Sequence, residues 1–124
     1  MSMSTEYIAG LFDGEGSVGL YHTKRQRGRT FSPSIRIDLR DERHTARLLS
    51  DLCARYDVKL VRTARGECSF RLTKGDTILR FIDDVLPFTR LKTTQLVLLQ
   101  AWLETKTYGH RFAQVIKNHK RRRR

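Results

Sequence analysis

Two carboxylates set among glycines are the first residues of this sequence whose types and spacing could do chemistry. Asp13, Gly14, Glu15 and Gly16 follow directly after an apolar stretch that starts at Ile8. Carboxylates beside the exposed carbonyls of a helix end form a hard-oxygen site of the kind that Mg²⁺ prefers. An ion held there could activate water and stabilise both oxygens of a phosphodiester displacement. Taken alone, Asp13 is better explained by local capping or a polar contact, and Glu15 by a solvated carboxylate in a turn.

The helix that must position these carboxylates has two different sides. Ile8, Leu11 and Phe12 recur at the spacing of one helical face, which predicts that this side packs in a core. The other side is nearly devoid of bulk, and its residues are Ala9, Gly10, Asp13 and Gly14. Small residues allow close helix approach. They are therefore predicted to form an interface with a second copy of the chain, with two Glu15 carboxylates side by side.

Strands with one apolar and one polar face follow this helix. Apolar and polar residues alternate in residues 17–23, 31–40 and 68–72, as expected for a half-buried sheet. A fourth short strand is predicted over residues 58–64, where Val61 and Thr63 would face in and Arg62 out, but Leu60 falls on the wrong side. The residues predicted to face inward are Val18, Leu20, Ile35, Ile37, Leu39, Phe70 and Leu72.

Helical patterns separate and follow the strands. One helix is predicted over residues 42–56 with Asp41 as its N-cap, a second from about Asp76 until Pro87 limits it, and a third over 93–105. The order αββαββ with C-terminal helices predicts an α+β fold in which helices cover the apolar face of one sheet.

The polar face of that sheet is a candidate nucleic-acid platform. Alternate strand positions carry hydrogen-bonding and cationic side chains that could contact base edges in the major groove, while nearby cations hold phosphates. The alternative is an ordinary solvated face. The candidate residues are Tyr21, Thr23, Arg25, Arg27, Arg29, Ser32, Ser34, Arg36, Asp38, Arg40, Arg62, Ser69 and Arg71.

The charge balance favours a polyanionic partner. Across 124 residues, 25 Lys and Arg against 13 Asp and Glu give +12, and residues 1–116 still carry +6 without the basic tail 117–124. No apolar stretch approaches the roughly 20 residues of a membrane span, and the N-terminus lacks signal-peptide features, so an intracellular protein without a membrane partner is expected. Cys53 and Cys68 have no metal or disulfide spacing and are predicted to be reduced core residues.

The segment IAGLFDGEG, residues 8–16, resembles the LAGLIDADG motif of homing endonucleases. Five of the nine positions are identical. Ile8 stands for the first Leu, Phe12 for Ile, Gly14 for Ala and Glu15 for the second Asp. The αββαββα core of that family also matches the predicted order of elements, with an antiparallel sheet that forms a DNA-binding saddle.

The resemblance implies an active site. Glu15 matches the acidic residue that binds the essential divalent metal, Mg²⁺ or Mn²⁺, and the carbonyl of Gly14 would help to coordinate it. The segment LPFTRLKTTQ is similar to one that carries a catalytic lysine in single-motif members. Lys92 is thereby implied to support the attacking water or the developing negative charge, although by itself it is explained as a surface lysine.

Two further positions depart from the family pattern. Asp41 falls where the family often has a polar side chain that orders the water network, and an acid here could recruit a metal or merely cap the next helix. A second basic family position falls at Thr45, so Arg43 or Arg47 would have to substitute for it.

A single motif without an internal repeat implies a two-fold homodimer, because cutting two strands needs two acidic sites. Residues 1–116 would form one endonuclease domain, followed by a disordered basic arm over 117–124. The two sheets would cover roughly 20 bp of a pseudo-palindromic duplex. Alternatives are a non-cutting relative, such as an intron-RNA maturase or a regulator, and an unrelated basic RNA-binding module.

Overall fold

The computed structural model describes residues 3–25, 28–106 and 109–122. Within these residues the elements are α1 (Thr5–Glu15), β1 (Gly16–Arg25), β2 (Gly28–Arg40), α2 (Arg43–Arg55), β3 (Val61–Arg62), β4 (Glu67–Leu72), α3 (Gly75–Val85), α4 (Thr93–Thr105) and α5 (Gly109–Arg122). This order confirms the α+β prediction.

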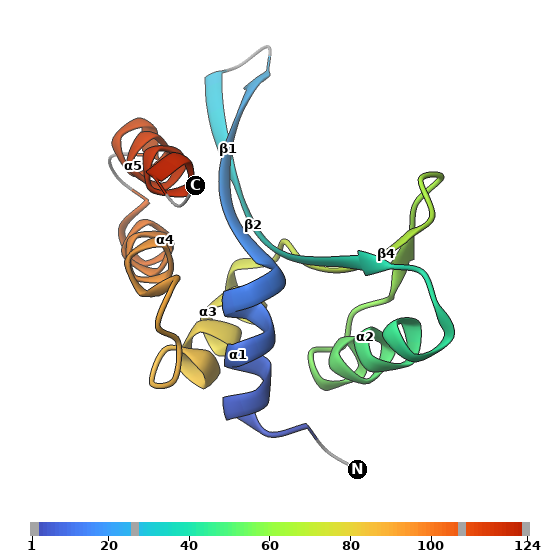
Figure 1. Cartoon of the computed structure of the whole chain (residues 1–124). Coiled ribbons are helices and arrows are strands. Elements are labelled where there is room, and N and C mark those ends of the chain that lie inside the picture. The colour runs from blue at the N-terminus through green and yellow to red at the C-terminus, as the bar shows by residue number, and fades with distance from the viewer. Residues whose placement is uncertain (1–2, 26–27, 107–108, 123–124) are drawn as a thin grey trace.

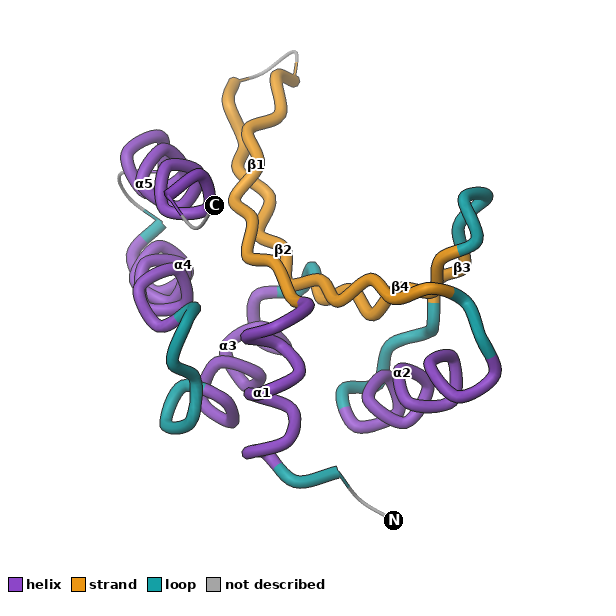
Figure 2. The backbone as a smooth tube through the Cα atoms, in the orientation of Figure 1, coloured by secondary structure: helices purple, strands orange, loops and turns teal. Residues whose placement is uncertain are grey.

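The strands form one antiparallel sheet in the order β1-β2-β4-β3. The long β1–β2 hairpin bends where β4 joins it, so the sheet has a concave side, and all the labelled helices lie on its convex side (Figures 1 and 2). Pro33 lies within β2 opposite Leu20. The pairing of β2 with β4 begins only at Ile35, so Pro33 lies where a missing N–H is tolerated.

The core lies between the sheet and the helices, as the alternation predicts. All of the strand residues predicted to face inward are fully or nearly buried except Leu39, which is partly buried. Phe81 of α3 is central, because its ring lies 5.1 Å from that of Phe12 and 5.4 Å from that of Tyr56. This aromatic cluster joins α1 to α3 beneath the sheet.

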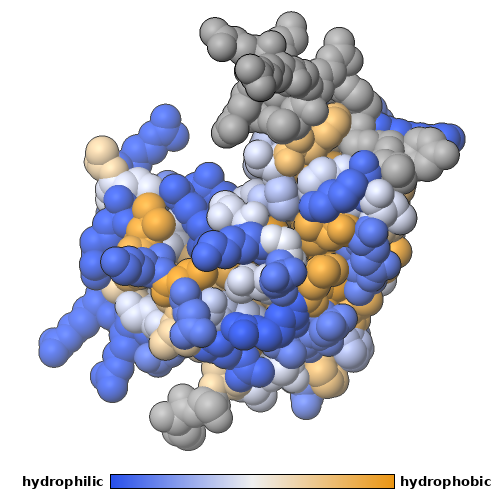
Figure 3. Space-filling model, turned by 180° about the vertical axis from the view of Figure 1, so that it is seen from behind, coloured by the Kyte–Doolittle hydropathy of each residue, from blue (hydrophilic) through white to orange (hydrophobic). Residues whose placement is uncertain are grey.

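The C-terminal segment differs from its prediction. Helix α5 continues through Arg122, so residues 117–122 belong to a helix rather than to a disordered arm. Seen from behind, the surface is mostly hydrophilic with apolar residues between the charged ones (Figure 3). Within the described ranges, none of the helices has the length and apolar character that crossing a membrane requires.

Candidate active site and nucleic-acid interface

Helix α1 ends abruptly at the residues singled out for metal chemistry. Its start is capped by Ser4, whose hydroxyl accepts a hydrogen bond from Tyr7 N at 3.1 Å. At its end Gly16 N donates to the carbonyl of Phe12, and β1 begins at once. A Cβ at Gly16 would overlap the Phe12 ring and lie 2.7 Å from the Phe12 carbonyl oxygen. Glycine therefore allows this sharp turn, which leaves Glu15 exposed at the start of the sheet.

Asp13 organises the loop between α3 and α4. Its carboxylate accepts hydrogen bonds from Thr89 Oγ1, from Arg90 N at 2.8 Å and from Leu91 N at 3.3 Å. Burial alone would raise the pKa of Asp13, but these hydrogen bonds and the charge of Lys92 outweigh it and hold the pKa below its ordinary value. Asp13 therefore makes polar contacts, as expected, but with a distant loop rather than as a helix cap.

Lys92 lies inside the protein, against the end of α1. Its side chain is 3% exposed, and Nζ donates to the Asp13 carbonyl at 3.0 Å. The ammonium also lies 5.8 Å from the centre of the Phe12 ring. The explanation of Lys92 as a surface lysine is therefore wrong. The structure brings this cation to the last turn of α1, two residues before Glu15.

Two of the four residues predicted to face a second copy of the chain are buried inside this chain. Ala9 is fully buried and Asp13 is 9% exposed, so neither can face a second copy, because both belong to the side of α1 that packs inside the chain. Gly10 and Gly14 are exposed, with no atom within 4 Å of a Cβ at either position. Tyr7, 52% exposed, lies on the same helix. The outward side of α1 thus carries two glycines and an exposed aromatic ring.

Asp41 is not placed with Glu15. Helix α2 is capped by Glu42, whose N–H donates to Thr45 Oγ1 at 3.0 Å, so the prediction of Asp41 as the N-cap is wrong. The Asp41 carboxylate instead accepts from Arg62 Nε at 3.1 Å. Gly16, next to Glu15, pairs with Ile37 of β2. Asp41 comes four residues after Ile37, and four residues of a strand span roughly 13 Å. The structure gives Asp41 a partner from β3 rather than from α1.

The concave face carries the described members of the predicted DNA-binding set except Arg62. Tyr21 is 51% exposed and lies over Gly19, where an added Cβ would overlap its ring. Ser32 and Arg40 are exposed, and Ser34 is partly buried. Arg62 is also exposed, but its register partner is the core residue Cys68, so it lies on the side of the helices, contrary to the prediction. Ser69 is fully buried, contrary to expectation, because it is covered by Asp38 and Arg71. The side chains of Thr23, Arg25, Arg27 and Arg29 lie outside the described part of the molecule.

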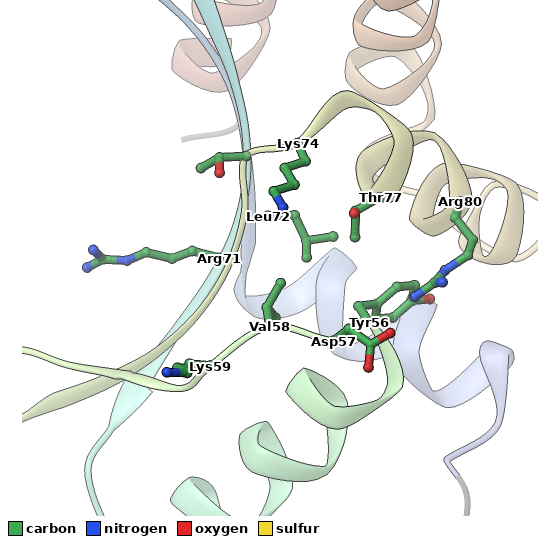
Figure 4. Close-up of a pocket in the computed structure, with 10 residues that line it drawn as sticks. Tyr56, Asp57, Val58, Lys59, Arg71, Leu72, Lys74, Thr77 and Arg80 are labelled. Atoms are coloured by element: carbon green, nitrogen blue, oxygen red, sulfur yellow. The ribbon is translucent and has the colours of Figure 1, made fainter.

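A cavity of about 360 Å³ lies apart from the end of α1, between β4, α3 and the segment after α2. Thr77 and Lys74 point into it, and the guanidinium of Arg80 lies 4.9 Å over the Tyr56 ring (Figure 4). Arg71, although it lines the rim, extends away from this cavity on the other side of β4. The basic residues at this end of the sheet therefore point to both of its faces.

The cysteines take no part in these sites. Cys53 and Cys68 are buried free thiols, which confirms the prediction of reduced core residues. Burial, with a smaller contribution from Cys68, raises the pKa of Cys53 to about 11. The thiol therefore stays protonated at neutral pH.

Sequence reasoning missed Thr89 and the loop around it. The hydrogen bond from Thr89 to Asp13 joins residues 76 apart in the sequence. The similarity of LPFTRLKTTQ to a family segment marked Lys92, but no local pattern marked the threonine three residues earlier. Only the docking of the loop on α1 shows what that residue does.

Comparison with solved structures shows which known fold this chain has. No family model matches the chain, and no curated protein matches it. The homing endonuclease I-CvuI in complex with a DNA target superposes with a TM-score of 0.83 at 14% identity, over 93% of this chain and 80% of that chain. The archaeal intron-encoded homing endonuclease I-Vdi141I complexed with DNA gives 0.77 at 12% identity, over 93% and 82%.

Another structural neighbour is longer. The LAGLIDADG homing endonuclease I-GzeII, in complex with its DNA target, gives a TM-score of 0.72 at 17% identity, over 93% of this chain but 43% of that chain. The two I-CvuI complexes were obtained in the presence of 2 mM Mg and of 2 mM Ca. As the resemblance of residues 8–16 predicted, this chain has the fold of the LAGLIDADG homing endonucleases.

Proposed function

We propose that this protein is a site-specific DNA endonuclease that works as a homodimer and cuts both strands of a long pseudo-palindromic site with a divalent metal ion. The observation that carries the proposal is the end of α1. There a buried Lys92 ammonium donates to the Asp13 carbonyl, two residues before the exposed Glu15 carboxylate. A cation and an acid at the same end of α1, where the helix meets the sheet of a basic protein, suit phosphodiester chemistry.

Glu15 and the carbonyl of Gly14 fit a magnesium ion as part of a shared site. The described residues contain no group of three or more His, Cys, Asp or Glu side chains suited to a metal, so one chain offers an incomplete set of ligands. Mg²⁺ accepts such a set, because it keeps several waters and takes substrate phosphates as ligands. When bound, it would supply a more acidic water and charge stabilisation at the phosphate oxygens.

Lys92 would act on charge rather than on the metal. Its Nζ is fixed by the Asp13 carbonyl and by packing over Phe12, so the ammonium is already oriented before DNA binds. A preorganised positive charge stabilises the negative charge that develops on phosphate oxygens in the transition state.

The homodimer would be built on the outward side of α1. Gly10 and Gly14 leave open space there, which allows another α1 to approach closely. A two-fold pair would place a Glu15 from each chain near the dyad and extend one concave sheet over each half-site. The coverage of most of the I-CvuI chain by this one supports a single-motif unit of this kind.

The proposal is tested with a plasmid library that carries randomised 24-bp inserts. Purified protein is incubated with the library and Mg²⁺, and broken ends are captured by adaptor ligation and sequenced. We expect staggered double-strand breaks in a pseudo-palindromic subset of inserts, and none with EDTA. Selective retention of inserts without any scission would contradict the endonuclease and support the non-cutting relative; preference for RNA over duplex DNA would support a maturase.

A further inference from the structure

Four polar side chains on the concave face form one hydrogen-bonded group. Arg36 and Asp38 come from β2, and Ser69 and Arg71 come from β4. The register pairs Arg36 with Arg71 and Asp38 with Ser69, so the four form a square across two neighbouring strands. We refer to them as the arginine square.

One carboxylate oxygen connects both arginines. Arg36 Nη2 donates to Asp38 Oδ1 at 3.2 Å. The Ser69 hydroxyl donates to the same oxygen and accepts from Arg71 Nε at 3.0 Å. Ser69 is fully buried and the side chain of Asp38 is 32% exposed, so this bridge is largely shielded from water.

The arginine square contains electrostatic repulsion and an unsatisfied donor, and DNA would compensate both. Two like charges directly across a strand pair repel each other, and a single carboxylate offsets only one of them. In addition, Arg36 Nε is buried and has no hydrogen-bond partner among the described residues. Such an arrangement leaves a positive charge at the surface whose complement is an acceptor from outside the chain.

The hydrogen bond between Arg71 and Ser69 directs the end of the Arg71 side chain outward. Its Nε is occupied by Ser69, and within the described part of the chain its two terminal nitrogens have no partner. Figure 4 shows the side chain extended, with those nitrogens at its far end and pointing away from the cavity that contains Thr77. A guanidinium with a fixed Nε and an unoccupied terminal fork has the geometry that pairs with O6 and N7 of guanine.

We infer that Arg71, with Arg36 beside it, recognises guanine in the major groove of each half-site, and that Asp38 and Ser69 are positioning residues rather than base contacts. This inference rests on the proposed function and adds the base preference of the site. Neighbouring strands lie about 4.8 Å apart and base pairs rise 3.4 Å. The two arginines therefore reach the same or adjacent base pairs.

The test is a binding selection with the full-length chain on a duplex library of 24 randomised base pairs in Ca²⁺. We expect the wild type to select guanine at symmetric positions in the two half-sites. Arg71→Gln should reduce that guanine preference roughly 5- to 150-fold and shift it towards adenine, because glutamine pairs with adenine N6 and N7. Arg36→Gln should act at the same or the adjacent position.

Ser69→Ala separates positioning from contact. It leaves both arginine charges in place, so the salt dependence of binding should stay unchanged, while the guanine preference at the Arg71 position weakens. A variant that was merely less stable would lose affinity for all sequences alike. If Ser69→Ala retained the wild-type preference in full, the positioning role would be wrong.

Arg80→Gln is the matched control, because it removes one positive charge as Arg71→Gln does. Arg80 lies at the cavity on the other side of β4. It should select the wild-type site. If Arg71→Gln and Arg36→Gln also select that site with guanine intact, the inference is overturned while site-specific binding stands. If the wild type itself selects no sequence, the proposed function fails, which is a different result.

Discussion

Asp13 and Glu15 are two residues apart, yet they lie in opposite environments. Asp13 is buried and holds three donors of the α3–α4 loop, whereas Glu15 is exposed at the turn into β1. Asp13 is therefore a structural acid that helps to position Lys92. Glu15 remains available for chemistry.

Glu15→Gln should abolish cleavage and retain site binding, because the amide keeps the shape of the side chain and loses the charge that holds a divalent ion. The measurement is parallel gel-shift and cleavage assays on a site obtained from the library. Robust cutting by this variant would refute the metal role of Glu15.

Lys92→Met should slow cleavage by about 10²- to 10³-fold, the cost of losing one preorganised charge, with a much smaller change in affinity. Methionine keeps most of the apolar stem that packs near Phe12. Arg90→Gln is the control, since it removes an exposed charge from the same loop and leaves the backbone N–H that binds Asp13. Equal slowing in both variants would indicate general phosphate attraction instead.

Asp13→Asn should reduce the free energy of unfolding at pH 7 by about 1–3 kcal/mol, because the amide cannot accept all the hydrogen bonds that the carboxylate receives. The pKa of Asp13 is lowered in the folded protein. Its contribution is therefore complete above the unfolded pKa of about 4 and is lost as the pH falls through the lower folded value.

Urea unfolding at pH 7, 5 and 3 measures this contribution. The difference between wild type and Asp13→Asn should be constant from pH 7 to 5 and shrink by pH 3. The exposed Asp51→Asn on α2 should match the wild type at each pH. A difference that grew on acidification would contradict the assigned direction of the pKa shift.

At the scale of elements, the junction of α1 and β1 decides where the acid and the cation meet. Helix and strand join without a loop because Gly16 has no side chain to collide with Phe12. The α3–α4 loop then docks on the last turn of α1 through Asp13. Together these two features place Glu15 and Lys92 at the same end of α1.

Gly16→Ala should destabilise the folded chain by roughly 1–3 kcal/mol, because its Cβ would overlap the Phe12 ring in a packed core. Gly14→Ala is the matched comparison, since a Cβ there meets open space. It should leave the stability of the isolated chain unchanged or slightly higher. Chemical denaturation compares the two; equal losses would show that the junction is not tightly packed.

At the scale of the whole molecule, a curved sheet faces one way and the helices face the other (Figure 1). The concave side carries the arginine square and exposed polar strand residues, while the outward side of α1 offers glycines. With a net charge of +12, the protein should bind duplex DNA with a steep dependence on salt.

The active protein should be a dimer of about 29 kDa, twice the 14.5 kDa of one chain. Sedimentation equilibrium measures this mass, and Gly14→Ala should shift the equilibrium towards the monomer, because a methyl group separates closely packed helices. A wild-type protein that cuts both strands while it remains a monomer would overturn the assembly.

The sequence by itself determined the order of the elements as far as α4 and the direction of the apolar faces of the three longer strands. Alternation across Val18, Ile35 and Phe70 indicated which side of each strand is buried, because side-chain direction in a strand is set locally. The residues IAGLFDGEG likewise indicated the fold. Two further predictions relied on local sequence alone. They are the position of Glu15 at a helix end and the helix over 93–105.

Only the tertiary structure decided which polar groups meet. Asp13 binds a loop more than 75 residues away, Asp41 pairs with Arg62 and Ser69 is covered by its neighbours across the strands. None of these follows from periodicity, which fixes a face but neither the register of paired strands nor the docking of a loop. Ala9 illustrates the limit: its small size suggested an interface, and packing buried it in the core.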